Sequence, residues 1–226
     1  MTTKRDLIFL ILVGVFVSNA ILAEIIGGKL IQVGPYLMSV GVILWPVVFL
    51  STDIVNEYFG KSGVRRLTFL TVSLIVYAFV VLYLAMWTKA ATVSPVTDEQ
   101  FTAVFGQSLW IIVGSIAAFL VSQFVDVSVF WFFRNKTGTG YLWIRTTGST
   151  AVSQLVDTFV IIGIAFYLPG KLSLNDYLKV ALVNYSYKLI IAVALTPVIY
   201  AFHSAIDRYL GKSASDKLIH DAEKKD

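Results

Sequence analysis

Cysteine is absent from the 226-residue chain, and histidine occurs only twice, as His203 and His220. The lack of cysteine excludes disulfides and thiolate-bound metals. Both histidines lie at or beyond the end of the last long apolar stretch, which argues against a haem or zinc held by histidine inside a bilayer. The sequence therefore predicts neither a metal site nor a cofactor.

Charge is also scarce. Asp, Glu, Lys and Arg make up 14% of the chain, against about 25% in an ordinary soluble domain. Hydrophobic residues make up 57%, and the mean hydropathy is +0.78. These values predict a membrane protein with one domain's worth of chain. The net charge of +4 does not indicate a nucleic-acid-binding surface, so we expect no nucleic-acid partner.

The sequence contains several long apolar stretches. A membrane-spanning helix needs about 20 apolar residues, and six stretches meet this length: 7–27, 36–59, 67–88, 101–133, 144–168 and 176–208. We therefore predict an all-α, polytopic membrane bundle. It forms a single domain of six transmembrane helices over residues 1–211, followed by a polar, frayed cytoplasmic tail at 212–226.

Basic residues are distributed unevenly between the two ends of these stretches. An even number of spans places both termini on one side, and that side then carries twelve basic residues against four on the other. Because cytoplasmic loops are enriched in Lys and Arg, both termini are expected in the cytoplasm. The four residues on the outer side are Lys29, Lys89, Lys171 and Lys179.

A ten-residue pattern occurs twice, as VSQFVDVSVF at 121–130 and VSQLVDTFVI at 152–161, with six identical positions. In each copy Ser lies four residues and Gln three residues before Asp, which places all three on one helical face. A carboxylate inside a membrane helix costs about 2.5–3.5 kcal/mol on insertion scales. Two interpretations remain open: the SQxxD blocks line a polar cavity, or they are interhelical polar contacts.

Other ionisable residues of the predicted spans are also costly to place inside a membrane. Asp157 and Lys188 are predicted at similar depth on different helices, and would therefore pair. Asp53, Glu57 and Glu24 lie close to the predicted ends of their spans, so two interpretations remain open for them: a solvated position near a membrane surface, or a place in the polar set inside the bundle. On that basis Asp157→Asn should reduce function more than Asp53→Asn.

Two prolines mark expected interruptions of the spans. They follow Trp45 and Thr196, at Pro46 and Pro197. A proline frees a backbone carbonyl, which is tolerated at membrane depth beside protein or a cavity. Interrupted helices are typical of transporter binding sites.

Four blocks resemble one known family. They are WPVVFLSTDIVNEYFGKSGVRR (45–66), SQFVDVSVFWFFRNKTG (122–138), WIRTTGSTAVSQLVDTFVIIGIAF (143–166) and VNYSYKLIIAVALTPVIY (183–200). They resemble the queuosine precursor transporters, also called vitamin uptake transporters. The resemblance implies a six-spanning bacterial inner-membrane protein, not an enzyme, that imports 7-deazaguanine precursors of the tRNA nucleoside queuosine. Members differ in whether they carry the 7-cyano or 7-aminomethyl compound or queuine.

The polar residues fit such a substrate chemically. A 7-deazaguanine presents N1–H and an exocyclic amine side by side, and one carboxylate can accept both. Its O6 needs a donor, and its faces favour aromatic side chains. The candidate substrate-binding residues are therefore Asp157, Gln154, Lys188, Asn184, Asp126, Gln123, Asn19, Asp53, Glu57, Arg145, Trp45 and Tyr185.

Two other functions remain as alternatives. The first is the substrate-binding membrane subunit of an energy-coupling vitamin uptake system that uses a separate ATPase. The second is an intramembrane aspartyl hydrolase using Asp126 and Asp157. No G-x-G-D pattern occurs, and the two residues differ in predicted depth by roughly 8 Å, which disfavours the hydrolase. The expected partners are the bilayer and a small nucleobase-like molecule, and a homodimer is left open.

Overall fold

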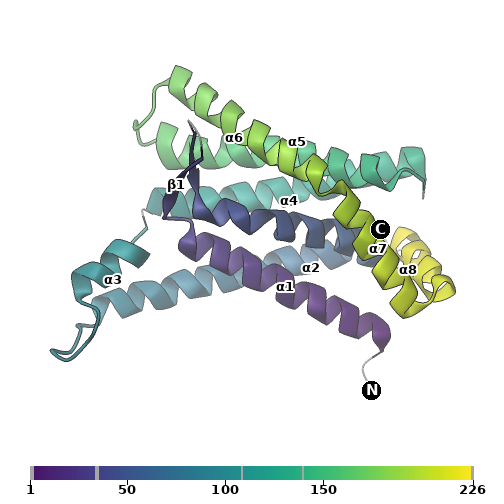
Figure 1. Cartoon of the computed structure of the whole chain (residues 1–226), viewed down its shortest axis with the longest axis horizontal. Helices are drawn as coiled ribbons and strands as arrows, with labels where there is room; N and C mark the ends of the chain where they lie inside the picture. Colours follow the sequence, from purple (N-terminus) through teal and green to yellow (C-terminus); the bar gives the residue numbers. More distant parts are fainter. Residues whose placement is uncertain (1–2, 34–35, 108, 139, 225–226) are drawn as a thin grey trace.

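The protein is a bundle of long helices in the computed structural model (Figure 1), which describes residues 3–33, 36–107, 109–138 and 140–224. This confirms the all-α membrane bundle. The helices are α1 (Lys4–Ile26), α2 (Trp45–Trp87), α3 (Asp98–Phe105), α4 (Leu109–Thr137), α5 (Leu142–Ile162), α6 (Leu174–Ala194), α7 (Thr196–Leu210) and α8 (Lys212–Lys224).

Five segments are long and apolar enough to cross a membrane. The longest, α2, has 43 residues, which at 1.5 Å per residue is about twice the thickness of a bilayer core. Its backbone turns at Gly60, where φ is 72° and ψ is −173°, a conformation that favours glycine. Figure 1 shows the chain reversing direction there, so the two halves of α2 run antiparallel. The six-span count stays a prediction, with Gly60 at the expected division.

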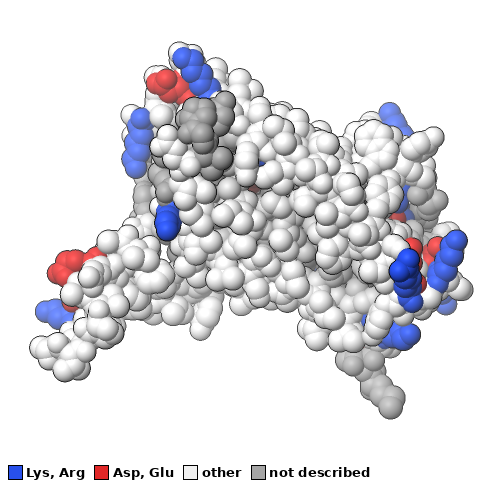
Figure 2. All heavy atoms as spheres, in the orientation of Figure 1, with Lys and Arg blue, Asp and Glu red and all other residues white. Residues whose placement is uncertain are grey.

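Both chain ends lie at the same end of the bundle in Figure 1. Figure 2 shows the charged side chains gathered at the two ends of the face in view, with a broad uncharged belt between them. Such a belt suits lipid contact, since charged side chains are costly in the hydrocarbon core. The cytoplasmic placement of the termini remains a prediction.

The expected helix over 36–59 is wrong over its first nine residues. Strands β1 (Leu30–Val33) and β2 (Tyr36–Ser39) pair antiparallel, with Leu30 opposite Ser39. A 3-10 turn, η1 (Val40–Ile43), follows, and α2 begins only at Trp45. Pro46 therefore does not interrupt a span. It occupies the first turn of α2, where the missing N–H costs nothing.

The second expected interruption is present. Helix α6 ends at Ala194 and α7 begins at Thr196, with Pro197 in the first turn of α7. The hydroxyl oxygens of Thr196 and Thr147 lie 2.9 Å apart, so a hydrogen bond holds the break against α5.

Residues Lys212–Lys224 form helix α8, in contrast to the frayed tail expected from the polarity of this segment. Leu218, Ile219 and Ala222 of α8 are buried. An apolar face of three side chains that recurs at helical spacing explains why a polar segment still folds against the bundle.

The centre of the bundle is the first half of α2. Every residue from Leu50 to Tyr58 is buried, including the polar ones. A helix enclosed on all sides needs partners for its polar groups from its neighbours, and these come from α4 and α5.

Candidate functional site

Besides Tyr58, the enclosed segment of α2 carries five polar side chains, each no more than 4% exposed: Ser51, Thr52, Asp53, Asn56 and Glu57. Glu24 of α1 is also buried, at 7% exposed. A solvated position for Asp53, Glu57 and Glu24 is therefore wrong, whereas their depth in the membrane stays a prediction.

Glu57 is fully paired. Arg145 Nε donates to Glu57 Oε2 at 2.9 Å, and Arg145 Nη2 donates to Oε1 at 2.8 Å. Arg134 Nη1 donates to Oε2 at 3.2 Å. Arg145 also donates from Nη1 to the carbonyl oxygens of Gly138 and Gly140. This two-pronged geometry is the strongest arrangement of an arginine with a carboxylate, and it ties α2 to the α4–α5 turn.

Asp157 and Lys188 form the ion pair that their depths predicted. Lys188 Nζ lies 2.7 Å from Asp157 Oδ2, and the two side chains are 15% and 14% exposed. This contact joins α5 to α6. A pair of this kind lets both charges persist inside a membrane protein.

The two SQxxD blocks bond to each other reciprocally. Ser153 of α5 donates to Asp126 Oδ1 at 3.0 Å, and Ser122 of α4 donates to Asp157 Oδ1 at 3.4 Å. The serine of each block thus serves the aspartate of the other. This supports the interpretation as interhelical contacts, but it uses only part of each block.

Several polar atoms of these blocks and of the adjoining part of α2 are buried without a partner among the described residues. They are Asp53 Oδ1, both amide atoms of Asn56, Gln123 Oε1, Asp126 Oδ2 and both amide atoms of Gln154. Leaving a buried polar atom unpaired costs about 1–3 kcal/mol. So many in one place indicate a site that water, an ion or a substrate satisfies.

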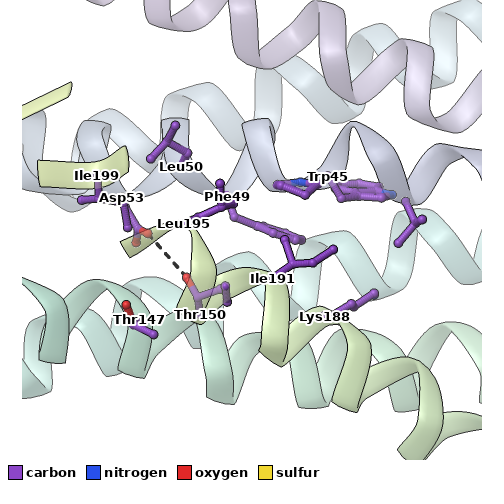
Figure 3. Close-up of a pocket in the computed structure, with 13 residues that line it drawn as sticks. Trp45, Phe49, Leu50, Asp53, Thr147, Thr150, Lys188, Ile191, Leu195 and Ile199 are labelled. Atoms are coloured by element: carbon purple, nitrogen blue, oxygen red, sulfur yellow. Dashed lines mark hydrogen bonds between the residues drawn. The ribbon is translucent and has the colours of Figure 1, made fainter. Parts of the chain in front are cut away.

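A pocket opens beside this cluster, between α2, α5, α6 and the start of α7 (Figure 3). Asp53 faces Thr150 across it, with Thr150 Oγ1 donating to Asp53 Oδ2 at 3.5 Å. Trp45 and Phe49 line the α2 side and stack at 5.8 Å between ring centroids and 17° between planes. Lys188 lines the α6 side.

The cavity volume is about 30 Å³. A water molecule needs about 10–15 Å³ by this measure, so the pocket has room for roughly two waters. The conformation is therefore closed around the site. Helix α6 forms an outer wall, and Ala181 is its only buried residue among those described.

The structure brings together only part of the predicted set. Asp53, Trp45 and Lys188 line the pocket, and Asp157 contacts it through Lys188. Asp126, Gln123 and Gln154 are buried next to it, while Glu57 and Arg145 neutralise each other.

Three predicted residues lie away from the pocket. The amide of Asn19 donates to the carbonyl of Val15 at 2.8 Å, and that of Asn184 donates to the carbonyl of Val180 at 2.9 Å, each within its own helix. Tyr185 is half-buried on α6 and is not part of the pocket lining. Asn184 lies one turn from Lys188, but a shared face did not bring its amide into the site.

Sequence reasoning missed Phe49, Thr150 and Asn56 as site residues. Thr150 belongs to a run of small hydroxyl residues on α5, with Thr146, Ser149 and Ser153, all buried. Their spacing of three and four residues is a usable signal for a closely packed helix face. Asn56 stands one turn after Asp53, on the same face of α2.

The pocket suits a small planar molecule with donors on one edge. An unpaired carboxylate oxygen, two stacked aromatic rings and an ammonium group converge on it. Asp126 and Asp157 do not form a hydrolase dyad, because each bonds a serine of the opposite helix and Asp157 is held by Lys188. Two carboxyl groups must share one proton for that chemistry.

Comparisons with known proteins identify the family of the chain. Residues 39–202 match the family described as "Putative vitamin uptake transporter". The chain is 30% identical over 165 residues to the "Probable queuosine precursor transporter" of Bacillus subtilis (strain 168), covering 72% of this chain and 70% of that protein. It is 29% identical over 158 residues to the protein of the same name from Haemophilus influenzae (strain ATCC 51907 / DSM 11121 / KW20 / Rd), covering 69% and 63%. No solved structure matches the chain significantly. The chain belongs to the vitamin uptake transporter family, and it is a multi-pass transporter of the plasma membrane rather than an enzyme.

Proposed function

We propose that this transporter imports a queuosine precursor, a 7-deazaguanine, and binds it in the pocket between α2, α5 and α6. The single observation that carries the proposal is Asp53. It is a carboxyl group that is 3% exposed, lines the pocket and has no partner for Oδ1 among the described residues. A deazaguanine supplies two adjacent N–H donors to such a group.

The rest of the lining matches the other parts of the base. The Trp45–Phe49 pair offers a flat aromatic surface, and stacking of a base on an aromatic ring contributes about 1–3 kcal/mol. The ammonium of Lys188 lies on the opposite wall and is the nearest strong donor for O6. The base therefore meets one acceptor, one donor and one ring surface.

Entry requires the pocket to widen, because the cavity of about 30 Å³ is far smaller than a purine-sized molecule. The break between α6 and α7 at Leu195 gives α6 a point about which it can move. Interrupted helices of this kind form substrate sites in other transporters.

The test is uptake in bacteria that cannot make deazapurines. Cells that express the chain receive each precursor in turn, and queuosine is measured in their tRNA. We expect queuosine with the wild-type chain and none with Asp53→Asn at matched membrane expression. Asp216→Asn, which removes an exposed carboxylate on α8, is the control and should transport normally. Absence of queuosine with the wild-type chain for every precursor would overturn the proposal.

A further inference from the structure

The buried part of the bundle holds more negative than positive groups. Its carboxyl groups are Glu24, Asp53, Glu57, Asp126 and Asp157, and its basic groups are Arg134, Arg145 and Lys188. Glu57 takes both arginines and Asp157 takes the lysine. Glu24, Asp53 and Asp126 are left without a cation among the described residues, although they are 7%, 3% and 5% exposed. Glu24 belongs to α1, whereas Asp53 and Asp126 both accept hydrogen bonds from α5.

Asp126 differs from Asp53 in one respect. Asp53 lines the pocket, whereas Asp126 does not. Asp126 lies behind the pocket between α4 and α5, where it accepts a hydrogen bond from Ser153 and keeps Oδ2 unpaired. A substrate in the pocket reaches Asp53, so the charge of Asp126 has to be compensated by something other than the substrate.

The two carboxyl groups are linked through one turn of α5. Thr150 bonds Asp53 at 3.5 Å, and Ser153, three residues later, bonds Asp126 at 3.0 Å. Both carboxyl groups are therefore held against neighbouring turns of α5. Two carboxylates that share such a site resist ionising together.

The other charged groups around Asp126 are already engaged. From α2 these are Asp53 and Glu57; from α5, Arg145 and Asp157; from α4 itself, Arg134. Glu57, Arg134 and Arg145 form one cluster, and Asp157 pairs with Lys188. Only Asp53 faces Asp126 with an uncompensated charge among the described residues.

The neighbours of Asp126 suit a proton. A protonated carboxyl group needs one acceptor for its O–H, and the amide oxygens of Gln123 and Gln154 in the SQxxD blocks are buried and unpaired. A buried carboxyl group without a cation is far less costly when it is protonated.

We propose that Asp126 carries a co-transported proton, so that the protein is a proton symporter. The inference rests on the proposed function. An O–H bond forms on Asp126 with a proton from the outer water and breaks when the proton leaves to the cytoplasm, so one proton enters with each substrate. Protonation of Asp126 removes its repulsion of Asp53, which leaves Asp53 ionised to receive the donors of the base. By linkage, substrate at Asp53 strengthens proton binding at Asp126 to the same degree.

The test uses purified full-length protein in liposomes with radiolabelled 7-deazaguanine precursor. Three conditions are compared: exchange against unlabelled substrate inside with no gradient, uptake driven by an acidic exterior, and uptake driven by external sodium at equal pH. A difference of two pH units allows up to about a hundredfold accumulation with one proton per substrate, since each pH unit is worth about 1.4 kcal/mol. Wild type, Asp126→Asn and the Asp216→Asn control are measured together, with monodispersity in detergent as the folding check.

We expect the acidic exterior, and not sodium, to drive accumulation by wild type and by Asp216→Asn. Asp126→Asn should lose this accumulation and keep exchange. The proposal is overturned if sodium drives uptake, if neither gradient does, if Asp126→Asn still accumulates, or if the folded variant loses exchange as well. Failure of wild type to exchange any precursor would instead overturn the proposed function, so the two outcomes are distinguishable.

Discussion

Glu57 and Asp53 stand one helical turn apart on α2, and their exposed fractions are 2% and 3%. Their surroundings are opposite. Glu57 receives three hydrogen bonds from two arginines, whereas Asp53 receives one long bond from Thr150 and keeps an oxygen unpaired. Equal burial thus has two meanings: the satisfied carboxylate holds helices together, and the unsatisfied one is available to a ligand.

The energetics favour this division. A buried ion pair contributes little net stability when both partners are present, but removing one partner leaves an uncompensated charge. An unpaired buried carboxyl group destabilises the folded protein, and a ligand that bonds to it relieves this cost. The same substitution, carboxylate to amide, should therefore have opposite consequences at the two positions.

The largest effect is expected at Glu57. Glu57→Gln leaves Arg134 and Arg145 buried with no countercharge, and this should lower the free energy of unfolding by about 3–5 kcal/mol. The measurement is unfolding in mixed detergent micelles, with Asp216→Asn as the control that should match wild type. Unchanged stability in Glu57→Gln would show that the cluster of Glu57, Arg134 and Arg145 does not hold the helices together.

The second largest effect is expected at Lys188. This side chain is both a paired and a pocket-lining group, because it pairs with Asp157 and lines the pocket. We expect Lys188→Met to reduce uptake by about tenfold or more, the loss of one charged hydrogen bond to substrate. The double variant Lys188→Gln with Asp157→Asn should not restore it, although removing both charges relieves the burial penalty. Restored uptake in the double variant would assign Lys188 to the structural class.

A smaller effect is expected at the aromatic wall. Trp45→Ala should raise the substrate concentration for half-maximal uptake by about tenfold, because stacking contributes about 1–3 kcal/mol per base. Trp45→Phe should recover most of the loss, since a ring remains beside Phe49. Equal defects in the two variants would mean that Trp45 acts through packing against Phe119, whose ring centroid lies 5.9 Å away.

The smallest effect is expected at Asn184. Its amide is already used by the carbonyl of Val180, so Asn184→Ala should leave precursor uptake within about twofold of wild type, as for surface changes that break no buried network. Uptake in the same deazapurine-deficient cells measures it. A large defect would return Asn184 to the binding site.

Much of the fold could be predicted from the sequence, because apolar runs of span length leave few alternatives. The break before Pro197 and the Asp157–Lys188 pair were also predictable, the first from proline chemistry and the second from equal depth. The start of α2 was not, because the apolar residues 36–44 suit a strand and a turn as well as a helix.

The site was less predictable. Asp53 appeared superficial because its distance to the end of its span is short, and only the packing of neighbouring helices buries it. The ranking expected from the sequence, with Asp157→Asn more harmful than Asp53→Asn, is untested, and the proposed site predicts the opposite order. The reciprocal bonds between Ser122 and Asp157 and between Ser153 and Asp126 depend on the antiparallel contact of α4 and α5. A repeated sequence pattern predicts polar side chains at equivalent positions of two helices, but it does not predict which of their atoms lack a hydrogen-bond partner.

The most direct measurement compares substrate binding and stability in Asp53→Asn and Glu57→Gln. Calorimetric titration of the detergent-solubilised proteins with a 7-deazaguanine precursor gives the binding constant, and detergent unfolding gives the stability. The account predicts that Asp53→Asn folds as well as wild type or better and binds at least about a hundredfold more weakly, as expected for loss of two charge-assisted hydrogen bonds. Binding of wild-type strength by Asp53→Asn would contradict it.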